Sequence, residues 1–426
     1  MHPIVVVLLD GLADRAHDSL GARTANEVAD TPNLDRLAAS GSNGVLFSLG
    51  PGRAPSSELA HWRILGYRPE EFPGRAVFEA VGAGQEVNSE HVFAYAALRP
   101  ADVRNGELWL TGRPRYGEDE EEARALVEAC DGIEVEGLRF SLAHIRRGEA
   151  VLRVEGGADD RVTDTDAFFR DRHPVLRPQP LVPEAERTAR AAEAWTRTVI
   201  ERLRGERFNV ITLKWCGRPR PVPSFEQRHG LRGTFVGESA FLRGLARWIG
   251  LEAIEEAESD DPPADLRRRL ERIEERLVAG DDFVFVHLKA TDTAGHTKDP
   301  AVKRATIEAL DGELGPLEAL AERAIVAVTG DHATPTYPDV IHSGDPVPFV
   351  LAGPGVRADA VTTFGELECA GGILGHLRGE DVMPVLLNAA DRPLFAGSRP
   401  TPFAGADGYP SLLDPLRIDE RASLDS

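Results

Sequence analysis

Cysteine is scarce in this chain of 426 residues. The three cysteines, Cys130, Cys216 and Cys369, lie far apart and form no CxxC pair. Neither a disulfide framework nor a cysteine-based zinc site is therefore indicated. This usage fits a reducing compartment, and we expect a cytoplasmic protein.

Positive charge is also in short supply. The chain has 49 Lys and Arg against 70 Asp and Glu, which gives a formal net charge of -21. Long-range attraction to a polyanion needs the opposite sign, so we expect no nucleic-acid partner. An anionic substrate would have to be held by cations placed locally.

The sequence contains no long hydrophobic run at its N-terminus. The stretch MHPIVVVLLDG has no basic flank and no small-residue cleavage site, and its apolar part is too short for a signal peptide or a membrane span. We therefore expect a buried strand there and no membrane partner. Nothing in the sequence demands a partner protein, and the oligomeric state stays open.

Short apolar runs rich in β-branched residues alternate with amphipathic helical patterns. The runs IVVVLL (4–9), FVFVHL (283–288), AIVAVT (324–329) and PFVLAG (348–353) are typical of strands buried on both faces. Helices are predicted at TPNLDRLAAS (31–40) and ADLRRRLERIEERLVAG (264–280). This alternation predicts an α/β fold with a mostly parallel sheet, whose ligand crevice lies beyond the carboxyl ends of the strands.

The middle of the chain has a different pattern. Alternating strands (FAYAALRP, AVLRVEGG), the charge run EDEEE and the proline-rich PVLRPQPLVP occur between residues 76 and 207. We interpret EDEEE as the solvated first turn of a helix. The pattern predicts an inserted second domain over 76–207, with the main sheet resuming at FNVITLKW (208–215), so that residues 1–75 and 208–426 form a discontinuous catalytic domain.

Potential metal ligands follow the predicted strands or open the predicted helices. Taken singly, each is more often a cap, a turn residue or a structural histidine. Together, three aspartates and three histidines fall on one edge of the predicted sheet, and imidazole with carboxylate suits Zn²⁺ or Mn²⁺. Two such ions about 4 Å apart form a clamp for phosphoryl transfer. The candidates are Asp10, Asp292, His296, Asp331, His332 and His342.

Two adjacent serines in GPGRAPSSELAHW (50–62) raise the question of a nucleophile. A serine hydroxyl needs an adjacent base or a metal ion to become reactive. His61 lies four residues after Ser57 and is a candidate base, but no GxSxG elbow surrounds the serine. We therefore favour metal activation over a hydrolase triad.

Several motifs together resemble one known family. They are LLDGLADR, TPNLDRLAASG, GPGRAPSSELAHWRILGY with GRAVFEAVGAG, FVFVHLKATDTAGH, GDHATP with HSGDPVPFVLAGPGVRAD, VTDTD (162–166) and PSFEQRHGLRG. The chain resembles, along nearly its whole length, the archaeal-type, 2,3-bisphosphoglycerate-independent phosphoglycerate mutases of the alkaline phosphatase superfamily. The resemblance implies an alkaline-phosphatase-like, mostly parallel sheet flanked by helices, with an inserted α+β lid domain that binds substrate.

The resemblance also implies roles for individual residues. Ser57 would be the phosphorylated nucleophile, with Ser56 in the place of the glycine in the family's GSD-type stretch. One divalent ion would be held by Asp292, His296 and His342, and the other by Asp10, Ser57, Asp331 and His332, with Mn²⁺ or Zn²⁺ favoured and Mg²⁺ as a further option. Candidate substrate-binding residues are Arg75, Lys289, Arg113, Lys214 and Asp164; for Arg75 and Lys289 a structural role is an equal alternative.

The implied reaction moves a phosphoryl group between the 3- and 2-hydroxyls of glycerate through a phosphoserine. The sequence departs from the family pattern near the substrate. LTGRPRYG (110–117) replaces an arginine-rich segment, Lys214 and Trp215 replace an arginine and a glycine, and Ala167 and Phe168 replace Pro-His. Lysine lacks arginine's bidentate fork, and an indole narrows the cavity it faces.

These departures leave an alternative open. It is a related phosphotransferase or phosphohydrolase that acts on another small phosphorylated or phosphonylated carboxylic acid in a specialised pathway. A non-catalytic binding protein that kept the fold ranks last, because the full ligand set and Ser57 would have little reason to coexist there.

Overall fold

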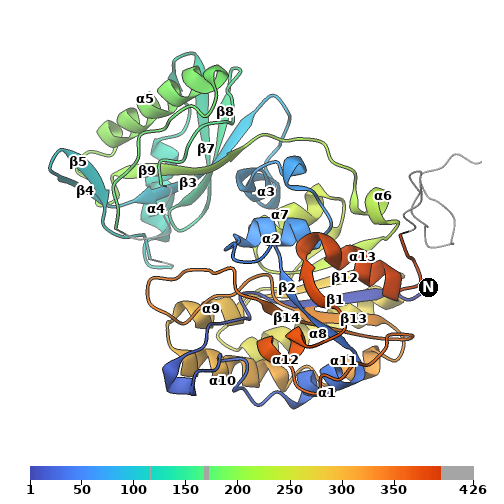
Figure 1. Ribbon diagram of the computed structural model, residues 1–426. Coiled ribbons are helices and arrows are strands. Elements are labelled where there is room, and N and C mark those ends of the chain that lie inside the picture. Colours follow the sequence, from blue (N-terminus) through green and yellow to red (C-terminus); the bar gives the residue numbers. More distant parts are fainter. Residues whose placement is uncertain (116, 167–171, 395–426) are drawn as a thin grey trace, which may run out of the picture.

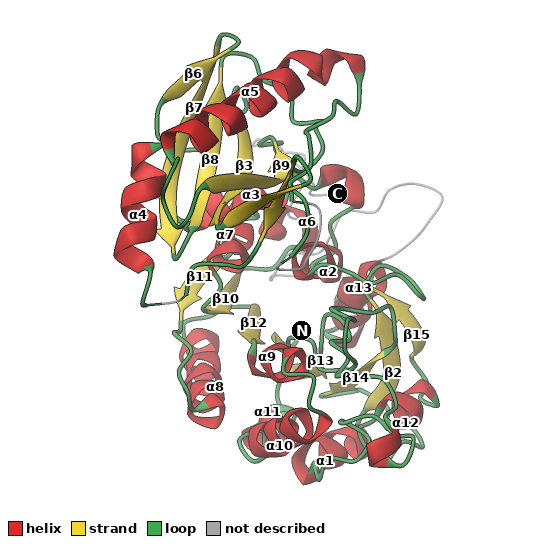
Figure 2. Ribbon diagram, turned by 90° about the vertical axis from the view of Figure 1, so that its left-hand side faces the viewer, coloured by secondary structure: helices red, strands yellow, loops and turns green. Residues whose placement is uncertain are grey.

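The computed structural model describes residues 1–115, 117–166 and 172–394, and it contains two lobes, each built on its own sheet (Figures 1 and 2). The larger sheet has eight strands in the order β11-β10-β12-β1-β13-β14-β2-β15. All run parallel except β14, which is antiparallel to both of its neighbours. The strands are β1 (Ile4–Leu9), β2 (Ser42–Phe47), β10 (Gly233–Gly237), β11 (Glu252–Glu255), β12 (Phe283–Leu288), β13 (Ile325–Thr329), β14 (Val347–Ala352) and β15 (Gly375–Arg378).

Helices cover both faces of this sheet. Figure 1 shows α1, α10 and α11 on one side and α2 and α13 on the other. Every residue of β1, β12, β13 and β14 is buried, as expected of strands covered on both faces. The helices of this lobe are α1 (Pro32–Ser40), α2 (Ser57–Ile64), α3 (Arg75–Gly82), α6 (Phe225–His229), α7 (Ala240–Trp248), α8 (Pro262–Val278), α9 (Ala290–His296), α10 (Pro300–Asp311), α11 (Pro316–Leu320), α12 (Glu366–Ala370) and α13 (Gly379–Ala389).

The smaller lobe carries a five-stranded antiparallel sheet in the order β6-β7-β8-β3-β9. Its core packs the helices α4 and α5 against the sheet, with the rings of Phe140 and Trp195 stacked 5.6 Å apart. Its elements are β3 (Val92–Arg99), α4 (Glu120–Ala129), β6 (Ile133–Val135), β7 (Leu138–Arg146), β8 (Glu149–Glu155), α5 (Glu186–Arg202) and β9 (Val210–Gly217), with the hairpin β4 (Ala101–Arg104) and β5 (Glu107–Leu110) beside them.

The strands predicted at 4–9, 283–288 and 324–329 and the helices predicted at 31–40 and 264–280 are present within two residues of the expected bounds. EDEEE does open a helix, since Asp119 is the N-cap of α4. No helix among the described residues combines the length and the apolar character that crossing a membrane requires.

One sequence expectation about topology is wrong. Residues 208–215 do not resume the main sheet, because β9 pairs with β3 of the smaller sheet, and the main sheet resumes only at β10. An apolar run predicts a strand but does not specify its partner. The chain crosses between the lobes at two glycines in contact, since a Cβ built on Gly217 would lie 2.7 Å from Cα of Gly74.

Helices α3 and α7 pack closely between the two lobes because each carries a glycine at the contact. A Cβ on Gly244 would lie 1.8 Å from the carbonyl oxygen of Phe78, and one on Gly82 would lie 2.0 Å from that of Ala240. Such distances leave no room for a side chain, so larger residues must push the helices apart.

We predict that Gly244→Ala lowers the free energy of unfolding by about 1–3 kcal/mol, the usual cost of overpacking. Gly312→Ala is the matched control, because its φ is -55° and the nearest atom to the added Cβ is 3.4 Å away. Urea unfolding of both variants checks this. Equal stability of the two variants would contradict the close packing of α3 on α7.

Candidate metal centre and interlobe cleft

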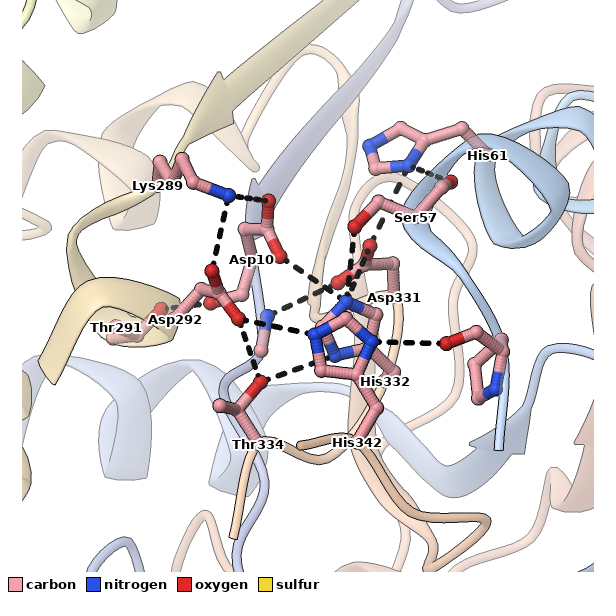
Figure 3. Close-up of polar contacts among 12 residues, drawn as sticks. Asp10, Ser57, His61, Lys289, Thr291, Asp292, Asp331, His332, Thr334 and His342 are labelled. Atoms are coloured by element: carbon pink, nitrogen blue, oxygen red, sulfur yellow. Dashed lines mark hydrogen bonds and ion pairs between the residues drawn. The ribbon is translucent and has the colours of Figure 1, made fainter. Parts of the chain in front are cut away.

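Three neighbouring parallel strands deliver acidic residues to one edge of the main sheet. Asp10 follows β1, Asp292 lies in α9 just after β12, and Asp331 follows β13, and these strands are adjacent in the order β12-β1-β13. The carboxyl ends of parallel strands meet at the same edge. Figure 3 shows the three carboxylates pointing toward one another.

The first group of potential metal ligands is Asp10, Asp331 and His332, whose ligand atoms lie within 4.8 Å of one another. Nε2 of His332 lies 3.4 Å from Oδ1 of Asp10 and 3.3 Å from Oδ2 of Asp331. Burial lowers the pKa of His332 to about 3, so this imidazole is neutral at pH 7.

Thr334 determines which nitrogen of His332 carries the proton. Its hydroxyl donates to Oδ1 of Asp292 (2.8 Å) and lies 3.2 Å from Nδ1 of His332. A hydroxyl has one hydrogen, so Nδ1 of His332 must donate to it. The lone pair of Nε2 then faces the carboxylates of Asp10 and Asp331.

The second group is Asp292, His296 and His342. The i, i+4 spacing of Asp292 and His296 does place both on α9, with 3.2 Å between Nε2 of His296 and Oδ1 of Asp292. His342 donates from Nδ1 to the carbonyl of Pro55 (3.0 Å), which turns its Nε2 toward Asp292 at 3.6 Å. The rings of His332 and His342 stack 3.8 Å apart, so the two groups adjoin.

Ser57 is the first residue of α2, and its Oγ lies 3.1 Å from Nε2 of His332. Ser56 precedes the helix as its N-cap and makes no side-chain cap hydrogen bond. His61, the alternative base, donates from Nδ1 to the backbone carbonyl of Ser57 (2.7 Å) and makes no described contact with its hydroxyl. The geometry therefore gives no support to a triad in which His61 is the base.

Sequence reasoning missed several residues that hold this cluster together. Nε2 of His287 donates to Oδ2 of Asp10 (3.0 Å), and the backbone N–H of Gly11 donates to Oδ1 of Asp331 (3.0 Å). The buried ammonium of Lys303 donates to three carbonyls, those of Gly11 (2.9 Å), Ala13 (2.6 Å) and Thr334 (2.8 Å). A polar residue inside the apolar run FVFVHL is the one signal that pointed to His287.

Lys289, a candidate substrate-binding residue, lies at the metal-ligand cluster. Its Nζ is 3.0 Å from Oδ2 of Asp292 and 3.8 Å from Oδ2 of Asp10. Burial lowers the pKa of Lys289, but the two carboxylates raise it by more, so the ammonium stays charged. It supplies a positive charge between the two acidic groups.

A cleft of about 580 Å³ separates this cluster from the smaller lobe. Ser56, Glu58 and His342 line it on one side, and Asp160 and Trp215 line it on the other.

Arg75, another predicted substrate-binding residue, also lines the cleft. Its Nη1 lies 3.2 Å from Oε2 of Glu58 and its Nε 3.1 Å from Oε1 of Glu79. Because both edges of the guanidinium are bonded to carboxylates, the contacts favour the structural role for Arg75.

The remaining predicted substrate residues lie together on the smaller lobe. Nζ of Lys214 in β9 is 3.0 Å from Oδ1 of Asp166, whose other oxygen is 3.1 Å from Nη1 of Arg99. Arg113 is exposed and close enough to Lys214 to lower its pKa, together with burial and Arg99. Burial raises the pKa of Asp164 to about 6. Ala167 and Phe168 lie outside the described residues.

Comparison with known proteins places this geometry in a family. The sequence model of the Metalloenzyme superfamily matches residues 2–389. The 2,3-bisphosphoglycerate-independent phosphoglycerate mutase 2 of Methanocaldococcus jannaschii is 32% identical over 93% of this chain and 95% of its own length. The Methanopyrus kandleri 2,3-bisphosphoglycerate-independent phosphoglycerate mutase is 35% identical over 91% of this chain and 96% of its own. The chain belongs to this mutase family.

Solved structures agree with the assignment. PH0037 of Pyrococcus horikoshii superposes with a TM-score of 0.75 and 27% identity over 93% of this chain and 99% of its own. The cofactor-independent phosphoglycerate mutase of Thermoplasma acidophilum gives a TM-score of 0.62 and 29% identity over 92% and 100%. The expected α/β fold, a mostly parallel sheet flanked by helices, is thereby confirmed.

This chain belongs to a metalloenzyme superfamily, which implies that it binds a divalent metal ion. The donor atoms of the first ligand group fit such an ion. Oδ1 of Asp10 and Oδ2 of Asp331 are buried without a hydrogen-bond donor. The lone pair of His332 faces the same point and has the Ser57 hydroxyl 3.1 Å away, so two unpartnered carboxylate oxygens and an imidazole nitrogen converge as the donors of a cation site do.

We predict that Asp331→Asn and Asp292→Asn each remove about one equivalent of bound metal, because an amide cannot replace an anionic ligand in either group. Asp299→Asn is the control, since Asp299 caps α10 next to the site and asparagine caps equally well. Mass-spectrometric metal analysis of Mn²⁺-loaded protein measures this. Full metal content in both variants would rule out these two groups as the ligands.

Proposed function

We propose that this protein is a metal-dependent enzyme that interconverts 3-phosphoglycerate and 2-phosphoglycerate through a phosphoserine at Ser57. The observation that carries the proposal is the position of the Ser57 hydroxyl, 3.1 Å from Nε2 of His332, which belongs to one group of potential ligands and stacks on His342 of the other. Mutase relatives over more than nine-tenths of the chain support the substrate. We place the enzyme in the cytoplasm.

The proposed ligands divide as the two groups do. Asp10, Ser57, Asp331 and His332 hold one ion, and Asp292, His296 and His342 hold the other. When bound, two such ions supply Lewis-acid stabilisation of the phosphoryl oxygens and of the reacting hydroxyls. Nitrogen and carboxylate donors favour Mn²⁺ or Zn²⁺, with Mg²⁺ a weaker candidate.

The chain's own residues perform the remaining steps. Oγ of Ser57 attacks phosphorus, and the bond from phosphorus to the substrate oxygen breaks. The phosphoryl group stays on Ser57 while glycerate turns, and its return to the other hydroxyl regenerates the serine. Ser57 loses one proton and the leaving glycerate oxygen gains one, and the return step reverses this exchange, so the cycle takes up no net proton from outside. Ser57 opens α2, where the helix dipole favours the phosphoryl charge.

The smaller lobe binds the other end of the substrate in this proposal. Lys214, Arg99 and Arg113 form a cationic group on this lobe, next to Trp215 of the cleft wall, and in the proposal they hold the glycerate carboxylate. The division of labour is a catalytic domain on the main sheet and a substrate-binding domain on the smaller sheet. Water is kept from the phosphoserine as the cleft fills with glycerate.

A second candidate function is phosphoryl transfer or hydrolysis on a different phosphorylated or phosphonylated carboxylic acid. The observation that favours it is the wall of the cleft, where Trp215 stands in place of the glycine expected from the resemblance, next in the chain to Lys214, which replaces an arginine. An assay with 3-phosphoglycerate that follows 2-phosphoglycerate and free phosphate together separates the two. Phosphate release alone, or no turnover, would favour the second function.

We predict that Ser57→Ala lowers kcat for mutase turnover by at least about 10³-fold, since the nucleophile itself is lost. Ser56→Ala is the matched control and is expected to change kcat less than about threefold, because Ser56 makes no cap hydrogen bond. Both proteins are assayed fully metal-loaded. A comparable loss in the two variants would mean that Ser57 is not the nucleophile.

We predict that Lys214→Met raises KM for 3-phosphoglycerate about tenfold or more, because a hydrogen-bonded charge contributes about 1.5–3 kcal/mol. Asp166 keeps Arg99 as a partner, so the fold should tolerate the change. Arg104→Met is the control, an exposed cation in β4 of the same lobe whose guanidinium lies 5.8 Å from the ring centroid of Trp109. An unchanged KM in Lys214→Met would exclude Lys214 from the carboxylate site.

A further inference from the structure

Trp215 occupies a backbone position that normally suits glycine. Between Tyr95, which pairs with Lys214, and Phe93, which pairs with Gly217, the register of β3 and β9 shifts. Trp215 therefore lies in a bulge, and its φ is +54°. Left-handed backbone is unusual for a bulky residue, and bulges near functional sites redirect side chains. Strain of this kind persists where the surrounding contacts hold it in place.

Trp215 is held by several contacts: its backbone N–H donates to Oδ1 of Asp164 (2.8 Å), its ring lies 5.0 Å from that of Tyr95, and it stacks on Arg75. Cζ of Arg75 lies 4.2 Å from the centroid of the Trp215 ring and 4.3 Å from that of the Phe241 ring. The guanidinium therefore makes two cation–π contacts. Its edges are paired with Glu58 and Glu79. We call Trp215, Arg75 and Glu58 the interlobe stack.

The interlobe stack joins the two ends of the proposed substrate site. Trp215 is the chain neighbour of Lys214 on the smaller lobe, and Glu58 is the chain neighbour of Ser57 on the larger one. The two chain crossings between the lobes also meet here, at Gly74 and Gly217. We therefore infer that the position of Lys214 relative to Ser57 depends on the contacts of Arg75 with Trp215 and Glu58.

We propose that Trp215 is a specificity-determining positioning residue that, through Arg75 and Glu58, fixes the spacing between Lys214 and Ser57. The stack thereby selects a small substrate with a phosphate at one end and a carboxylate at the other. A ligand that occupies only the metal end does not depend on it. This inference rests on the proposed function, because it takes the two ends of the cleft as the two ends of one substrate.

The test compares a ligand that spans the cleft with one that does not. Dissociation constants for 3-phosphoglycerate and for inorganic phosphate are measured by calorimetry on Mn²⁺-loaded protein. Trp215→Gly relieves the left-handed strain and removes the stack, and it is expected to weaken 3-phosphoglycerate binding roughly tenfold, as a desolvated cation–π contact allows. Phosphate binding should change less than about twofold.

Trp109→Gly is the matched control. Trp109 lies in β5 of the same lobe, with Cζ of Arg104 5.8 Å from its ring centroid, and it does not line the cleft. It should leave both constants unchanged. Trp215→Phe, which restores a ring, should recover most of the lost affinity, and Arg75→Lys, which keeps the charge and loses the planar stack, should behave like Trp215→Gly.

Three results would overturn the inference: equal weakening of both ligands in Trp215→Gly, no weakening of either, or the same change in Trp109→Gly. If the unaltered protein binds phosphate but not 3-phosphoglycerate, the proposed function is wrong. In that case X-ray scattering tests the inference about Trp215 independently of the substrate. Trp215→Gly should broaden the distribution of interlobe distances, whereas Trp109→Gly should not. An unchanged distribution in Trp215→Gly would contradict the inference.

Discussion

Mutual repulsion of buried carboxylates is the constraint around which this structure is organised. Asp10 and Asp331 place oxygens at most 4.8 Å apart, and two like charges at that distance repel by about 3 kcal/mol or more at an effective dielectric constant of 20. Burial raises the pKa of Asp331, and the charge of Asp292 also raises it, so a second cost, the loss of water around the carboxylate, adds to the repulsion. Lys289 and the N–H donors of Gly11 and His287 offset part of it, and the donor geometry suits cations for the rest.

The parts of the site that depend on residues near one another in the sequence could be predicted from the sequence. Asp10, Asp292 and Asp331 each come just after an apolar strand, and parallel strands deliver such residues to one edge, so their convergence needed no knowledge of side-chain contacts. The i, i+4 spacing placed His296 beside Asp292 for the same reason. The described cluster contains all six predicted aspartates and histidines.

Long-range pairing could not be predicted in the same way. The run FNVITLKW predicts a strand whichever sheet it joins, and its choice of β3 depends on residues more than a hundred positions away. Arg75 sits in a family-like motif, yet its edges face Glu58 and Glu79, which no spacing rule indicates. Thr334 links the two ligand groups through one hydroxyl, a role that only the folded geometry reveals.

The inserted smaller sheet provides a surface that is separate from the acidic metal-ligand cluster and can carry positive charge. A chain of net charge -21 with a carboxylate-rich centre repels a phosphorylated acid at long range, so binding depends on cations brought close on a separate surface. In the proposed function Lys214 and Arg99 provide that surface; they share Asp166, whose negative charge offsets the repulsion between the two cations. Both crossings of the insertion meet at Gly74, just before α3, whose first residue Arg75 pairs with Glu58 of the helix that begins at Ser57. The lobe that supplies the cations is thus attached where its position bears most directly on the nucleophile.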